Sequence, residues 1–215
     1  METVSALPAV AALPQRPDCV VIALPIDAVE EAVLQCAGQD VGGILIFASG
    51  YAETGRPERI AMQRRLTQIA QEHDLRIVGP NSLGFFNFTI RAGLSFTRSD
   101  ICIDAFRGRG IGIVSQSGSM AFAQSQGAFR GVSLSHVIAL GNSCDIDIAD
   151  AVAYLAGDPA CHAIVCIFEG LAEPQRLIEA GDIAWAAGKP LIVCKQGVGE
   201  TGARVRQRHP RARLA

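Results

Sequence analysis

The sequence alternates short apolar runs with longer stretches in which apolar residues recur every three or four positions. Runs such as CVVIAL (19–24) and AIVCIF (163–168) are apolar throughout, which is typical of strands buried on both faces. The intervening stretches have the period of amphipathic helices. This order predicts an α/β fold with parallel sheets and helices on both faces. The predicted strands are residues 19–24, 43–48, 75–78, 110–114, 136–139, 163–168 and 190–195, and the predicted helices are residues 26–37, 57–73, 117–129, 148–155 and 174–187.

The alternation stops between residues 81 and 109, where Phe, Thr, Arg and Gly mix without a period. We interpret this stretch as a crossover between two sheets and place the domain boundary near residue 105. The first predicted domain is then residues 1–104 and the second is residues 105–200. The final segment, residues 201–215, has five arginines and no apolar period, so we expect a disordered basic tail.

Composition and charge argue against several classes of protein. A formal net charge of −2 gives no reason to expect nucleic acid or an anionic membrane as a partner. No apolar run reaches the length of a membrane span, and the N-terminal stretch lacks the basic flank of a signal peptide. The seven cysteines are scattered without a CxxC pair, so we expect reduced thiols in the cytoplasm and no metal site.

The turn within residues 111–120 (IGIVSQSGSM) has the sharpest chemical signal. It follows a predicted buried strand and opens a helix, whose free N–H groups and positive dipole end favour an anion. Glycine lets the backbone approach that anion closely, and serine caps a helix through its side-chain oxygen. An ordinary serine-capped turn is the alternative, since the stretch is neither a P-loop nor a GxGxxG motif. The candidate phosphate ligands are Ser115, Gln116, Ser117, Gly118 and Ser119.

Two more loops follow predicted strands, at the edge where open α/β sheets bind ligands. GPNSLG (79–84) combines two glycines with a proline and an asparagine, which indicates either a constrained ligand loop or a plain turn. LGNSCDID (140–147) has the same position before a helix. Asp145 and Asp147 are candidates to bind a metal or a basic group, but helix capping is the favoured interpretation.

Two glutamates complete the candidates. Glu169 follows the apolar strand AIVCIF, and a carboxylate there needs water, a cation or a hydrogen-bond donor. Glu53 lies in the loop SGYAETG (49–55), which is also compatible with simple solvation. The four histidines form no metal-ligand spacing and no Ser-His-Asp arrangement.

Seven landmarks occur in order along the chain: VVIALP, ILIFASGYAETG, GPNSLG, GIVSQSGSM, ALGNSCDID, FEG, and AAGKPLIVCKQG followed by ETGAR. Together they cover about residues 7–204. In this order and spacing they resemble the CoA-binding half of the NDP-forming acyl-CoA synthetases, relatives of the succinyl-CoA synthetase α subunit. The resemblance implies a partial Rossmann-like CoA-binding domain followed by a flavodoxin-like CoA-ligase domain.

The resemblance also implies a reaction. Members of this family interconvert acyl-CoA, NDP and phosphate with a carboxylic acid, CoA and NTP through a phosphohistidine. By position, His209 corresponds to the phosphorylated histidine and Glu169 to the glutamate that steadies its ring, while the turn after residue 114 holds the phosphate. The residues that correspond to CoA contacts are Pro25, Ser49, Gly50, Glu53, Thr54, Asn81 and Ser82.

The implied ligands are CoA and a small carboxylic acid or acyl-CoA, with ATP or ADP and Mg acting only through an ATP-grasp subunit or domain. Homo-oligomers are also compatible with the family. The sequence departs from the family pattern: the first strand with its glycine-rich turn is absent, and Arg208 and Pro210 flank His209. We therefore expect a chain truncated at both ends, inactive alone. The alternatives are a non-catalytic CoA-binding or acyl-CoA-binding module, or an inactive fragment, and an unrelated Rossmann-like nucleotide binder.

Overall fold

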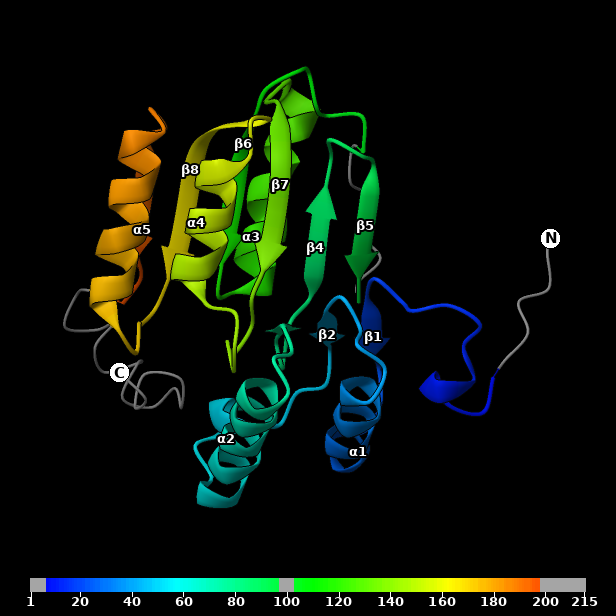
Figure 1. Ribbon diagram of the computed structural model, residues 1–215. Helices are drawn as coiled ribbons and strands as arrows, with labels where there is room; N and C mark the ends of the chain where they lie inside the picture. The colour runs from blue at the N-terminus through cyan, green and yellow to red at the C-terminus, as the bar shows by residue number, and fades with distance from the viewer. Residues whose placement is uncertain (1–6, 97–102, 198–215) are drawn as a thin grey trace.

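A computed structural model of the protein describes residues 7–96 and 103–197, which form two sheets with their helices (Figure 1). The smaller sheet consists of three parallel strands in the order β1-β2-β3. Its strands are β1 (Val20–Ile22), β2 (Ile44–Ile46) and β3 (Ile77–Val78), joined by helices α1 (Ile26–Ala37) and α2 (Pro57–Glu72). Short 3-10 helices η1 (Val10–Ala12) and η2 (Ala52–Thr54) lie in the adjoining loops.

One hydrophobic core joins both helices to the smaller sheet. Val29 and Val33 of α1 are spaced one helical turn apart, as are Leu66 and Ile69 of α2, and all four are buried against the strands. Both crossovers therefore pack into the same core, as expected where strands follow one another in sequence order with right-handed connections.

The larger sheet has six strands in the order β5-β4-β7-β6-β8-β9. The four strands β7, β6, β8 and β9 are parallel, and the hairpin of β4 and β5 joins antiparallel to β7. The strands are β4 (Gly84–Asn87), β5 (Ala92–Ser95), β6 (Gly110–Ser115), β7 (Leu134–Ala139), β8 (Cys161–Phe168) and β9 (Leu191–Lys195). The helices are α3 (Gly118–Ser125), η3 (Gln126–Arg130), α4 (Ile148–Gly157) and α5 (Pro174–Ala186).

Helices cover both faces of the larger sheet. Successive residues of a strand point to opposite faces, so Ile113 packs into the core of α3, whereas Val114 packs into the core of α4 and α5. Figure 1 shows α3 behind the strands, with α4 and α5 in front. The predicted α/β class with parallel strands and covering helices is confirmed.

The predicted absence of strands between residues 81 and 109 is wrong. β4 and β5 lie there and pair with each other, and β4 also pairs with β7 from Gly84 opposite Ala139 to Asn87 opposite His136. These short strands have no clear apolar period because their pairing depends on a strand far along the chain. The strands change sheet between β3 and β4, whereas the domain boundary near residue 105 stays a prediction.

A loop of the larger sheet covers the free edge of the smaller one. The backbone N–H of Ile146 donates to the Ile77 carbonyl (3.1 Å), and the Ile77 N–H donates to Asp145 Oδ2 (2.8 Å). A third hydrogen bond joins the same two loops: the backbone N–H of Cys144 donates to the Gly79 carbonyl at 2.9 Å. Both backbone groups of Ile77 are thereby satisfied, and the loops that follow β3 and β7 are held side by side.

Within residues 7–96 and 103–197, none of the helices combines the length and the apolar character needed to cross a bilayer. The cysteines in the same part of the chain are free; Cys36, Cys144, Cys161 and Cys166 are buried, while Cys19 and Cys194 are exposed.

Candidate functional site between the two sheets

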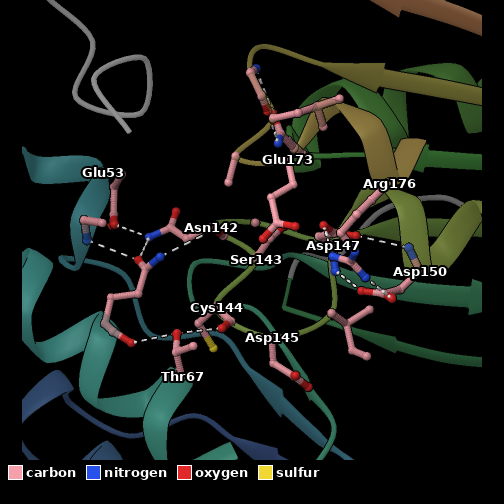
Figure 2. A pocket seen from close by; sticks show the side chains of 18 of the residues that line it. Glu53, Thr67, Asn142, Ser143, Cys144, Asp145, Asp147, Asp150, Glu173 and Arg176 are labelled. Atoms are coloured by element: carbon pink, nitrogen blue, oxygen red, sulfur yellow. Dashed lines mark hydrogen bonds and ion pairs between the residues drawn. The ribbon is translucent and has the colours of Figure 1, made fainter. Parts of the chain in front are cut away.

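A polar pocket of about 600 Å³ lies where loops of both sheets meet (Figure 2). From the smaller sheet it receives Glu53 of η2 together with Gln63 and Thr67 of α2. From the larger sheet it receives the loops that follow β7 and β8 and the first turn of α5. These loops leave the carboxyl ends of parallel strands, which is the ligand-binding edge of open α/β sheets.

The lining of this pocket is strongly acidic, with six carboxylates and two guanidinium groups. Arg176 is tied to two of the carboxylates, with Nη1 at 2.5 Å from Asp147 Oδ2 and Nη2 at 2.6 Å from Asp150 Oδ1. Burial by itself would lower the pKa of the Arg176 guanidinium, but the two neighbouring carboxylates outweigh it and raise that pKa. The charged lining residues are Glu53, Asp145, Asp147, Asp150, Glu169, Glu173, Arg76 and Arg176.

Asp145 and Asp147 take different structural roles. Asp147 caps α4, accepting from the backbone N–H groups of Ala149 (2.8 Å) and Asp150 (3.1 Å) in a capping box. The capping interpretation is confirmed for Asp147. Asp145 instead binds the backbone of β3, and burial raises its pKa. In the described parts of the chain, no three His, Cys, Asp or Glu side chains cluster so as to hold a metal ion.

Only one residue of the predicted phosphate-binding turn (residues 115–119) lines this pocket. That residue is Gln116. Ser115 is fully buried; its hydroxyl donates to the Ser117 carbonyl (2.9 Å) and accepts from the Ser117 N–H (3.0 Å). Ser117 and Ser119 Oγ atoms lie 3.1 Å apart at the start of α3. The predicted serine cap is wrong, because no side chain caps this helix.

Gly118 has a packing role in this turn. A Cβ atom at residue 118 would lie 2.4 Å from Leu83 Cγ, so the GPNSLG loop needs glycine there. The close fit joins the start of α3 to the loop that leads into β4. Phosphate binding by residues 115–119 stays a prediction.

Gln116 connects the ends of β6 and β8. Its Nε2 donates to the Gly170 carbonyl at 2.7 Å, and its Oε1 accepts from the Glu169 N–H at 2.9 Å. Both functions of the amide are therefore used to place residues 169–170, and Glu169 itself lines the pocket. Gln116 therefore holds this turn beside Glu169 at the ends of adjacent strands.

The predicted CoA contacts lie at the carboxyl ends of β1 and β2. Pro25, Ser49 and Thr54 are exposed, while the N–H of Gly50 donates to Glu53 Oε1 at 2.5 Å. A Cβ atom on Gly50 would lie 3.5 Å from Ile26 Cδ1, so the loops after β1 and β2 are neighbours. The structure thus brings these residues to one surface, and their contact with CoA stays a prediction.

The other two predicted CoA contacts, Asn81 and Ser82, differ in exposure. Asn81 is half-buried and its Nδ2 donates to Asn142 Oδ1 at 3.2 Å. Ser82 is buried; its hydroxyl donates to the Ala139 carbonyl (2.5 Å) and accepts from the Gly84 N–H (2.9 Å). The Ser82 hydroxyl therefore joins the two sheets and has no surface facing the pocket. His209 lies outside the described residues.

The structure adds pocket residues that sequence reasoning assigned no role. Asn142 and Arg176 interact with predicted residues, and Thr67 Oγ1 donates to the Cys144 carbonyl at 2.6 Å. The spacing of Gln63 and Thr67, one turn apart on a long polar helix, is a signal that a polar stripe of α2 faces another element. No local signal identifies their partners.

The fold and the pocket define an α/β ligand-binding protein in which a Rossmann-like sheet and a flavodoxin-like sheet share one site. Two family models match the chain: a CoA binding domain over residues 1–87, and a succinyl-CoA ligase like flavodoxin domain over residues 108–215. The chain therefore belongs to the succinyl-CoA ligase-like family, and its homologues are ADP-forming acetate–CoA ligases. The resemblance predicted from the seven landmarks is confirmed.

Several relatives are similar along nearly the whole chain. Acetate–CoA ligase [ADP-forming] I of Archaeoglobus fulgidus is 32% identical, over 94% of this chain and 29% of its own. The α subunit of acetate–CoA ligase [ADP-forming] II of Pyrococcus furiosus is 29% identical, and the match covers 97% of this chain and 44% of that subunit. Among solved structures, one that matches is the dinucleotide forming acetyl-coenzyme A synthetase 1 of Ca. Korarchaeum cryptofilum in complex with phosphate and ADP. Its TM-score is 0.83 at 27% identity, and the match covers 96% of this chain and 43% of that chain. The chain spans less than half the length of each.

Proposed function

We propose that this chain is the CoA-binding part of an acid–thiol ligase that interconverts acyl-CoA, NDP and phosphate with a carboxylic acid, CoA and NTP through a phosphohistidine. The observation that carries the proposal is the pocket shared by the two sheets. Ala52 and Glu53, from the predicted CoA loop, line one side of it, and Gln116 with Glu169 line the other. A ligand held by the first sheet can thus reach groups positioned by the second.

The residues around the smaller sheet fit a ligand that carries phosphate groups. The 16-residue helix α2 begins just after the predicted CoA loop, so the positive end of its dipole lies beside that loop. Arg56 and Arg59 add two guanidinium groups in the same place. CoA supplies the thiol that accepts the acyl group. Ser49 and Thr54 are exposed on the predicted CoA loop, where the Thr54 hydroxyl donates to the Tyr51 carbonyl at 2.8 Å.

On the other side of the pocket, Glu169 is placed to orient an imidazole. Its backbone is fixed by Gln116, and its position at the end of β8 directs it to the pocket. A carboxylate beside a histidine holds the ring and favours its charged form. We assign the phosphorylated histidine to His209 and the nucleotide site to an ATP-grasp subunit or domain.

CoA binding tests the first half of this proposal. Titration calorimetry should show saturable binding of CoA to the wild-type chain. Ser49→Glu places a negative charge on the predicted CoA loop and should weaken that binding about tenfold. Gln35→Glu adds the same charge to the exposed side of α1 and should leave binding unchanged. Absence of CoA binding by the wild type would refute the proposal.

Phosphoryl transfer tests the second half. The chain is incubated with ATP and a cognate ATP-grasp subunit, and acid-labile phosphoryl label is measured. His209→Ala should abolish the label, Glu169→Gln should reduce it, and the exposed-site control His73→Ala should retain it. CoA binding without any label on the wild type would instead identify a non-catalytic CoA-binding module, an outcome favoured by the arginine and proline that flank His209.

A further inference from the structure

Asn142 lies at the centre of the contact between the two sheets. It follows β7, and Figure 2 shows its side chain directed toward Glu53. In all, the side chain contacts three segments on the side of the smaller sheet. Nδ2 donates to Glu53 Oε2 at 2.5 Å and to Gln63 Oε1 at 2.9 Å, and Oδ1 accepts from Asn81 Nδ2 at 3.2 Å. One amide therefore bridges the loop after β2, helix α2 and the loop after β3.

The hydrogen-bonding capacity of an amide matches this arrangement. A primary amide has two N–H donors and one acceptor oxygen, and all three functions of Asn142 have partners. The backbone strengthens the link, because Asn142 N–H donates to the Pro80 carbonyl at 2.9 Å. Aspartate has the same shape but no N–H donor, so it cannot donate to the Glu53 carboxylate or to Gln63 Oε1.

Through Glu53 this link extends into the predicted CoA loop. Glu53 uses one carboxylate oxygen for Asn142 and the other for the Gly50 N–H. Gly50 and Gly55 have positive φ values of 100° and 72°, so the loop relies on two glycines and gains its fixed shape from contacts such as these. The carboxylate is thus a brace between Asn142 and the loop backbone.

We propose that Asn142 is a positioning residue, which holds the CoA loop of the smaller sheet in its binding conformation from across the shared pocket. The inference rests on the proposed function. Asn142, Glu53 and Gln63 lie outside the hydrophobic cores of the two sheets, so a substitution at residue 142 removes no core packing. Loss of the link changes the placement of the loop and the affinity for CoA.

Asn142→Asp is the direct test. It sets a second carboxylate against Glu53, and we expect the dissociation constant for CoA to rise on the order of tenfold, since a half-buried charged group loses its donor. In the variant the like charges of the two facing carboxylates favour uptake of a shared proton as the pH falls from 8 to 5, which allows an O–H···O bond. The affinity of the variant, relative to wild type at each pH, should therefore recover at acidic pH.

Two further variants separate positioning from general damage. Combining Glu53→Gln with Asn142→Asp reverses donor and acceptor, and the double variant should bind CoA more tightly than Asn142→Asp alone. Asn87→Asp makes the same change where the side chain acts as an acceptor, from Thr89 N–H at 3.0 Å, and should behave as wild type. An affinity loss in Asn142→Asp that neither acid nor the double variant restores would overturn the proposal.

Hydrogen exchange gives a readout without CoA. The Gly50 amide, which donates to Glu53, should exchange at least tenfold faster in Asn142→Asp than in wild type, while amides of β6 keep their rates. Equal Gly50 rates would refute the brace. If the wild type does not bind CoA, the proposed function fails, and the role of Asn142 in CoA binding fails with it even where exchange shows the brace. If the wild type binds CoA and Asn142→Asp binds it equally well, only the inference about Asn142 is rejected.

Discussion

At the residue scale, burial decides which polar side chains can carry chemistry. His136 is almost fully buried beside Tyr154, and neither of its ring nitrogens has a hydrogen-bond partner among the residues that the structure describes. Its nearest charged group is Asp158, with Oδ2 at 3.5 Å from Nε2. Burial lowers the pKa of His136 despite the opposing effect of Asp158, so the imidazole is kept neutral.

This histidine should make the fold sensitive to acid. Because its folded pKa is depressed below its ordinary value of 6.5, the unfolded chain binds the proton more readily. Stability from the neutral ring is thus fully present above about pH 6.5 and is lost as the pH falls below it. Urea unfolding between pH 8 and 5 should give a shallower pH dependence for His136→Gln than for wild type. Parallel curves would contradict this assignment.

Gly118 is the second residue whose environment makes a sharp prediction. Ala at this position would place Cβ against Leu83, and overpacking of this kind costs about 1–3 kcal/mol. Removing the opposing side chain relieves the contact, so Gly118→Ala with Leu83→Ala should lose less stability than the sum of the single variants. Denaturant midpoints of the four proteins measure the coupling. Strict additivity would mean that Gly118 is needed for something other than this contact.

At the element scale, α4 shows how a local motif is used for a longer-range contact. The Asp147 cap fixes the start of the helix, and the same carboxylate pairs with Arg176 on α5. α4 and α5 pack together over one face of the larger sheet. The cap and the ion pair therefore fix the two helices at the border of the shared pocket.

Substitutions at residue 147 can separate these two contributions. Asp147→Ala removes the cap and the ion pair and should cost about 1–2 kcal/mol of unfolding free energy. Asp147→Asn keeps an acceptor for the cap, and the ion pair is partly exposed, so its loss should cost about 0–1 kcal/mol. Urea unfolding at neutral pH measures both values. An equal loss in the two variants would show that the ion pair, rather than the cap, stabilises the helix.

At the scale of the whole molecule, the two sheets differ in size and are joined by a single system of loops. The smaller sheet has strands of two or three residues, whereas β6 and β8 of the larger sheet have six and eight. Along β3, the loop after β7 replaces a neighbouring strand, with Asp145 and Ile146 binding both backbone groups of Ile77. The smaller sheet depends on the larger one for that edge.

Hydrogen exchange should therefore divide the molecule into two parts. Amides of β1 and β2 should exchange faster than those of β6 and β8, because short strands near an edge open at lower free energy than central strands. Mass spectrometry of deuterated peptides from residues 20–46 and 110–168 compares them directly. Equal protection would show that the two sheets open as one cooperative unit.

Elements whose pattern is local can be predicted from the order of the amino acids alone. α1 begins and ends at the predicted residues, because a buried face repeating every three or four positions needs only neighbours in the chain. The landmarks in their order also predicted the family, and the position of Asp147 before an apolar run predicted its cap.

The other features depend on contacts between distant parts of the folded chain. The pairing of β4 with β7 joins residues about fifty apart, and the bonds of Asn142 reach Glu53, 89 residues away. Neither contact produces a repeating pattern in the sequence. A strand edge or a side-chain amide has several possible partners, and the packing of the two sheets selects one of them. The chemistry of single residues can be predicted from their type, whereas the pocket they share depends on which distant loops the folded chain brings together.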